Sequence, residues 1–98
     1  MTIEIKESVL TEAHNIIYGD REKTYGHPSK NLQTIADMWT AYLHSASNGA
    51  LVDLEFSPED VAVMMILLKA ARLANNPKHR DSVVDICGYA ALIERCGE

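Results

Sequence analysis

The sequence predicts an all-α fold, a single domain of four helices, and three observations lead to this prediction. Apolar residues recur every three or four positions along most of the chain, as they do on one face of a helix. No segment shows the regular alternation of apolar and polar residues that marks a half-buried strand. With 98 residues, 47% of them hydrophobic and 23% charged, the chain is long enough for one folded domain over residues 1–98 and too short for two.

The first predicted helix covers about residues 7–18, and Gly19 follows it where a helix end is expected. The second begins near Ser29, after His27-Pro28, and ends at the polar stretch 44–49. Its apolar residues form one stripe that includes the aromatic side chains, so we expect that stripe in the core. The stripe consists of Leu32, Ile35, Ala36, Trp39, Tyr42 and Leu43.

The third predicted helix has the clearest start in the sequence. Ser57 is an N-cap residue, Pro58 suits the first helical position, and Asp60 belongs to the capping turn. From Val61 to Ala74 the helix is apolar on nearly every side, so we expect it to be buried all round and central.

Asn75-Asn76-Pro77 ends that helix, and a fourth helix is predicted from about His79 or Asp81 to Arg95. Three amphipathic neighbours cover one side of an apolar helix better than all sides. Because small helical domains often complete such a core by association, we expect a homo-oligomeric bundle.

The composition argues against several classes of protein. Nine basic residues against 14 acidic ones give a net charge of −5, which disfavours a general electrostatic grip on nucleic acid. No apolar run is long enough for a membrane span. The first ten residues lack the basic start and apolar run of a secretory signal, so we expect the chain to stay in the cytosol. Cys87 and Cys96 lack the spacing of a metal site or a disulfide framework.

Two basic residues interrupt the apolar third helix. Lys69 and Arg72 stand three positions apart and therefore point the same way. On the fourth helix Asp81 and Asp85 share a stripe with Gly88, where a glycine lets another backbone or a ligand approach closely. If the two helices pack antiparallel, the four charged groups meet near the turn that joins them.

The sequence leaves two interpretations of these four residues open. In one, Asp81 and Asp85 neutralise Lys69 and Arg72 in a structural salt-bridge network. In the other, the basic pair contacts a phosphate or carboxylate while the acids orient it or hold a divalent metal. No cofactor is required by the sequence; magnesium, bound together with substrate phosphate, is the one that such a carboxylate pair would hold.

The segment 18–28 is the second candidate site, because it is long for a connection and rich in binding residues. Tyr25 can stack on a base or sugar while Arg21 and His27 reach a phosphate. The alternative is structural: Arg21 caps the first helix, Tyr25 fills the core, and 26–28 is merely a turn. Composition alone does not decide between them.

A set of short motifs spread over nearly the whole chain carries a family resemblance. The motifs are Tyr18-Gly19-Asp20-Arg21, Tyr25-Gly26-His27-Pro28, Asn31, Ala36, Trp39, Tyr42, Pro58-Glu59-Asp60-Val61, Met65-Ile66-Leu67-Leu68-Lys69, Arg72-Leu73, Asp81, Asp85 and Gly88-Tyr89. In these residues the chain resembles a family of small helical proteins encoded by tailed bacteriophages and prophages. The resemblance implies a phage origin and a place in the host cytoplasm, and it carries no assigned activity.

The same residues resemble, more loosely, the all-helical nucleotide pyrophosphohydrolases of the MazG type. Those enzymes hold magnesium with an ExxE pair on one helix and an ExxD pair on the next. Here Lys69 and Arg72 stand where one acidic pair is expected, and Asp81 and Asp85 are four positions apart instead of three.

Three functions follow from these patterns. The first is a phage accessory protein that binds a nucleotide-like phosphorylated small molecule through the candidates named above, and so sequesters a host signalling nucleotide. The alternative is a magnesium-dependent nucleoside triphosphate pyrophosphohydrolase that uses Asp81 and Asp85. The third is an inhibitor that binds a host protein through its acidic surface.

Overall fold

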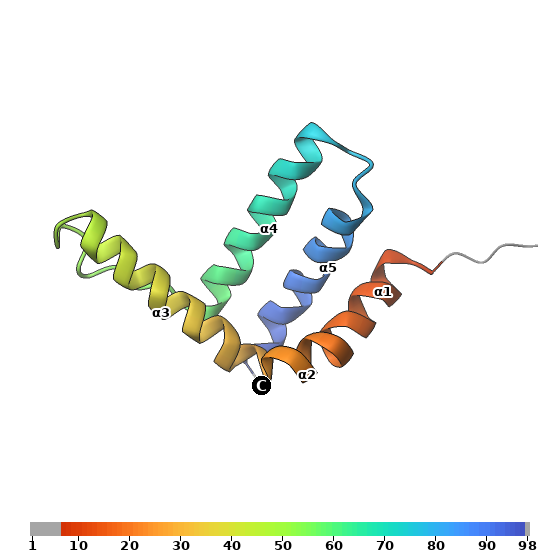
Figure 1. Cartoon of the computed structure of the whole chain (residues 1–98), viewed down its shortest axis with the longest axis horizontal. Helices are drawn as coiled ribbons and strands as arrows, with labels where there is room; N and C mark the ends of the chain where they lie inside the picture. Colours follow the sequence, from red (N-terminus) through yellow and green to blue (C-terminus); the bar gives the residue numbers. More distant parts are fainter. Residues whose placement is uncertain (1–6, 98) are drawn as a thin grey trace, which may run out of the picture.

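The computed structural model describes residues 7–97, which form four helical segments and contain no strand (Figure 1). The predicted all-α fold is confirmed. None of the helices in this range has the length and apolar character needed to cross a membrane. The expectation about a secretory signal rests largely on residues 1–6, which lie outside the described range. The elements are α1 (Val9–Asn15), the π-helix η1 (Ile16–Asp20), α2 (Arg21–Tyr25), α3 (Pro28–Ala46), α4 (Pro58–Asn75) and α5 (Arg80–Arg95).

Helices α4 and α5 form an antiparallel hairpin, and the segment α1–η1–α2 lies along the other side of α5 (Figure 1). Helix α3 crosses the base of the hairpin and then projects away from it. The core lies at that crossing, where α3, α4, α5 and η1 meet. Its buried members are Ile17, Leu32, Ala36, Val61, Ala62 and Leu92.

The predicted start of α4 is confirmed in detail. The Ser57 hydroxyl accepts a hydrogen bond from the Asp60 backbone N–H at 3.1 Å, and the Asp60 carboxylate accepts one from the Ser57 N–H at 2.8 Å. This reciprocal capping box satisfies two backbone donors that a helix start otherwise leaves open. Pro58 occupies the first turn as expected.

The prediction that the helix over 61–74 is buried all round is wrong for a single chain. Val61 and Ala62 are buried, but Leu67 and several other apolar side chains of α4 are exposed. The physical reason is coverage: the described neighbours that pack on α4 are α3 and α5. Tyr42, expected in the core stripe of α3, is also exposed, because it lies on the part of α3 that extends beyond the hairpin.

The expected end of the first helix at Gly19 is also wrong. The chain continues through η1 and α2, and the break comes at Gly26, whose φ of 79° is readily available only to glycine. The wide π-turn is supported from α5, where the Arg95 guanidinium donates a hydrogen bond to the Ile17 carbonyl at 3.2 Å. The segment predicted as an 11-residue connection is therefore mostly helical.

Candidate ligand-binding site

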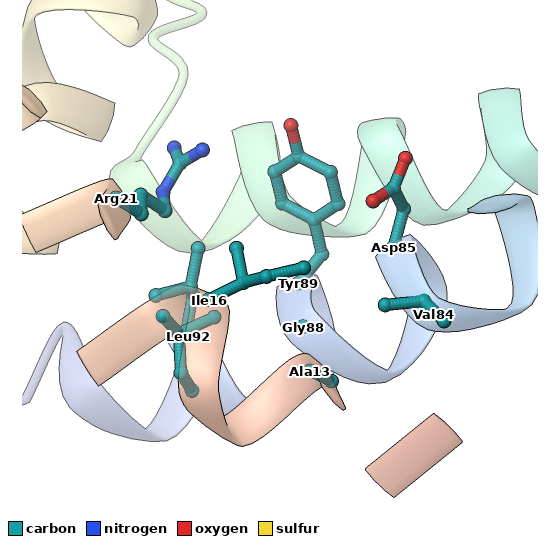
Figure 2. Close-up of a pocket in the computed structure, with 9 residues that line it drawn as sticks. Ala13, Ile16, Arg21, Val84, Asp85, Gly88, Tyr89 and Leu92 are labelled. Atoms are coloured by element: carbon teal, nitrogen blue, oxygen red, sulfur yellow. The ribbon is translucent and has the colours of Figure 1, made fainter. Parts of the chain in front are cut away.

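A small pocket of about 80 Å³ lies between the segment α1–η1 and helix α5. Its floor is apolar, and Figure 2 shows the Tyr89 ring standing between Arg21 on one side and Asp85 on the other. Gly88 helps to form the floor because it has no side chain to fill the space. The lining residues are Ala13, Ile16, Ile17, Arg21, Val84, Asp85, Gly88, Tyr89 and Leu92.

Arg21 is held on two aromatic rings at the rim of the pocket. Its guanidinium carbon lies 5.3 Å from the ring centroid of Tyr25 and 5.5 Å from that of Tyr89. One terminal nitrogen donates a hydrogen bond to the Asn31 side-chain oxygen at 2.8 Å. All these partners are uncharged, and over residues 7–97 no carboxylate forms an ion pair with Arg21. Its positive charge is therefore fixed in place without being neutralised by direct contact.

Lys69 reaches Asp85, one of the residues that line the pocket, from α4. Its ammonium nitrogen lies 2.9 Å from a carboxylate oxygen of Asp85, and the two side chains are 12% and 37% exposed. This ion pair matches the structural interpretation of Lys69, because Asp85 neutralises the Lys69 charge before any ligand binds. It also holds Asp85 on the α4 side of the pocket.

The other two members of the expected charged group do not join this pair. Arg72 and Asp81 are both exposed, and no ion pair links either of them to another described residue. The reason is position along the hairpin: Arg72 and Asp81 lie closer to the joining turn, where the side chains open to solvent. The four charges therefore form one bridge and two free surface groups instead of a network.

His27 serves as the N-cap of α3 and does not line the pocket. Its Nδ1 accepts a hydrogen bond from the Ser29 backbone N–H at 3.2 Å and lies 2.8 Å from the Ser29 hydroxyl. Pro28 follows at the first helical position. The structural interpretation of the Gly26-His27-Pro28 turn is thus supported. Among the other candidates, Arg21 lies against the Tyr25 ring, and Lys69 pairs separately with Asp85.

Asp81 and Asp85 do not fit a magnesium site in this arrangement. Lys69 occupies the Asp85 carboxylate, and Asp81 is exposed one turn earlier on α5. Within residues 7–97 no three His, Cys, Asp or Glu side chains gather closely enough to hold a metal ion.

Sequence reasoning missed two residues that shape this region. Tyr89 stands four positions after Asp85, so helical spacing alone places both on the same face, but an isolated tyrosine gave no reason to single it out. Arg95 is buried and holds η1 through the Ile17 carbonyl. No local signal marks it, because an arginine in the last turn of a helix normally only complements the helix dipole.

These features define a small all-helical protein with one fixed, unneutralised arginine beside an apolar pocket. The chain belongs to the family described as domain of unknown function DUF6378, which residues 8–97 match. It is 49% identical over 88 residues to the Gene 55 protein of Mycobacterium phage L5, and 43% identical over 94 residues to the Gene 55 protein of Mycobacterium phage D29.

These two alignments cover 90% and 96% of this chain but 51% and 56% of the relatives, so the chain spans about half their length. The expected resemblance to a phage-encoded family is confirmed. No solved structure matches the chain.

Proposed function

We propose that this chain binds a nucleotide-like phosphorylated small molecule at the pocket beside Arg21. The observation that carries the proposal is the state of Arg21: an ordered guanidinium whose contacts are two tyrosine rings and an amide. Arg80 and Arg95, in contrast, form ion pairs with carboxylates. A fixed cation with spare N–H donors is what binds a phosphate most effectively.

The dimensions of the site define how such a ligand would lie. Pockets that enclose a whole drug-sized ligand measure about 300–1,000 Å³, whereas this one measures about 80 Å³. The phosphate therefore sits at the rim on Arg21, and a small part of the ligand enters the apolar floor. The exposed ring of Tyr25 offers a stacking surface for the base or sugar outside the pocket.

The proposed role is sequestration of a host signalling nucleotide by a phage accessory protein in the host cytoplasm. The phage relatives support this setting. The proposal also includes a homo-oligomer, because one chain leaves much of α4 uncovered. His27, Arg72 and Asp81 remain candidates only for the outer part of a ligand, since none of them lines the pocket.

Calorimetric titration with inorganic phosphate and a panel of linear and cyclic nucleotides tests the proposal. We expect at least one nucleotide to bind, and Arg21→Gln to weaken binding by roughly tenfold to a hundredfold, the effect of one charge-assisted hydrogen bond. Lys23→Gln is the matched control, because it removes one positive charge from an exposed side chain two positions away. Absence of binding across the panel, or equal loss in both variants, contradicts the proposal.

A further inference from the structure

Helix α4 carries an apolar face that no described part of the chain covers. Leu67 is 62% exposed at its centre, and large apolar side chains surround it at helical spacing. Three alanines continue the face toward the end of the helix. We define this α4 face as Val63, Met64, Leu67, Leu68, Ala70, Ala71 and Ala74, all of them exposed.

An apolar groove extends the α4 face toward α3. It measures about 400 Å³ and lies between the end of α3, the loop before α4 and the first turns of α4. Val63 and Met64 belong both to the groove and to the α4 face. Figure 1 shows that α3 and α4 diverge from the base of the hairpin. A helix laid on the α4 face therefore also meets the groove.

The α4 face is complementary to itself in the antiparallel direction. Its large side chains lie in the first half and its small ones in the second half. Two antiparallel copies place Val63 and Met64 of one chain over the alanines of the other, whereas parallel copies place large side chains against large ones. Close approach of helices needs small residues at the contact, as here.

The charges agree with the same direction. No charged residue lies on the face between Asp60 near its start and Arg72 at the edge of its end. Antiparallel pairing brings the acidic end of one helix toward the basic end of the other and also opposes the two helix dipoles. A different protein would need none of this internal symmetry, whereas an isologous dimer requires it.

We propose that a second copy of this chain covers the α4 face, forming a dimer in which two α4 helices pack antiparallel about a two-fold axis near Leu67. The interface is separate from the proposed ligand site. Lys69 follows Leu67 by two positions and so points about 200° round the helix, where it meets Asp85 at the pocket. Failure of the dimer and failure of ligand binding are therefore distinguishable.

Sedimentation equilibrium over a concentration series tests the dimer. The unaltered chain should have twice the mass of one chain at micromolar concentration. Leu67→Glu places two carboxylates against each other at the axis and should raise the dissociation constant roughly a hundredfold or more, since facing like charges cost several kcal/mol. Leu10→Glu is the matched control, because Leu10 is similarly exposed but lies on α1. It should leave the mass unchanged.

A cross-link tests the direction of pairing. Under a two-fold axis near Leu67, the variant Leu67→Cys meets its own copy and should form a covalent dimer on mild oxidation. The unaltered chain, with Cys87 and Cys96 only, provides the background. A monomeric unaltered chain overturns the proposal, as does a dimer that Leu67→Glu leaves intact. A dimer that Leu67→Cys does not cross-link overturns the antiparallel arrangement.

Discussion

Two arginines of this molecule rest on tyrosine rings, and they differ in burial and in the charge of their hydrogen-bond partner. Arg95 lies 4.3 Å from the ring centroid of Tyr18, is buried, and bonds to the Glu22 carboxylate at 2.8 Å. Arg21 lies on Tyr25 and Tyr89, is half-buried, and bonds to the neutral Asn31.

The difference separates a structural cation from an available one. A buried guanidinium needs a carboxylate to offset its lost hydration, and Arg95 has one. Arg21 is half-buried and keeps part of its hydration, so rings and an amide are sufficient partners for it. Substitution of Arg95 should therefore lower the free energy of unfolding more than substitution of Arg21, which should mainly affect ligand binding.

The largest expected effect is on Arg95. Arg95→Leu should lower the free energy of unfolding by about 3 kcal/mol, because it breaks a buried ion pair and leaves the Ile17 carbonyl without its donor. The expected loss lies at the low end of the range for buried ion pairs, because Glu22 is 38% exposed and keeps part of its hydration. Urea denaturation followed by circular dichroism measures it.

Arg80→Leu is the control for this prediction. Arg80 also pairs with a carboxylate, Glu12 at 2.9 Å, but the Arg80 side chain is 48% exposed whereas that of Arg95 is 6% exposed. Exposed pairs contribute about 0–1 kcal/mol. A loss in Arg80→Leu as large as that in Arg95→Leu would show that burial does not separate the two kinds of arginine.

Lys69 is the next test, since its partner Asp85 lines the same pocket as Arg21. Lys69→Ala should cost about 1–2 kcal/mol of stability, less than a fully buried pair, because Asp85 is 37% exposed and becomes hydrated. It also leaves the Asp85 carboxylate without its counter-ion beside the pocket. Phosphate binding should weaken, because two negative charges repel each other. Denaturation and calorimetry on the same preparation give both values.

Asp85→Asn is the companion variant that distinguishes binder from enzyme. It frees Lys69 and removes a carboxylate from the rim, so a phosphate binder should bind its ligand more tightly. A pyrophosphohydrolase that depends on Asp85 should instead lose turnover of triphosphates. Pyrophosphate release that disappears in Asp85→Asn would contradict the binding proposal.

Arg21→Gln should lower the free energy of unfolding less than Arg95→Leu or Lys69→Ala does. Its two ring contacts are worth about 0.5–1 kcal/mol each near the surface, and glutamine retains part of the packing, so we expect a loss of about 1 kcal/mol. A loss near that of Arg95→Leu in urea denaturation would make Arg21 a structural residue like Arg95.

The helix starts were the most predictable part of this fold. Ser57, Pro58 and Asp60 act through neighbouring backbone groups, so their roles are visible in four consecutive residues. The end of the first helix was not, because Gly19 sits inside a π-turn that Arg95 supports from the far end of the chain. Local spacing contains no information about such a contact.

The candidate site was predictable in part for the same reason. Lys69 and Asp85 lie on the facing sides of the two helices of the hairpin, and helical spacing predicts this placement. The meeting of Arg21 with Tyr89 depends on how far the first segment continues as a helix. The burial of α4 was overestimated because an apolar pattern reports what must be covered and does not say whether the same chain covers it.

Gly88 lines the same pocket as Arg21, and its substitution should have a smaller and opposite effect on stability. A β-carbon at Gly88 would stand 3.5 Å from Ile17 Cγ2, an ordinary contact. Gly88→Ala should therefore gain about 0.5–1 kcal/mol from helix propensity while narrowing the pocket and weakening ligand binding. Gly19→Ala, where nothing lies within 4 Å and no pocket is lined, is the control for stability without the effect on binding.

The smallest effect concerns Cys96, the residue after Arg95. Burial, and then the negative charge of Glu59, raise the pKa of the Cys96 thiol above its ordinary value of 9.0. Above about pH 9 the unfolded chain releases this proton more readily than the folded chain, so stability is lost as pH rises from there toward the raised pKa.

The free energy of unfolding, measured between pH 8 and pH 10.5, should fall less steeply with pH in Cys96→Ala than in the unaltered chain. Tyrosines and lysines also titrate in that range and are common to both proteins, so only the difference between the curves belongs to Cys96. Parallel curves would mean that the thiol ionises equally well folded and unfolded, and that the end of α5 is open to water despite its contact with the core.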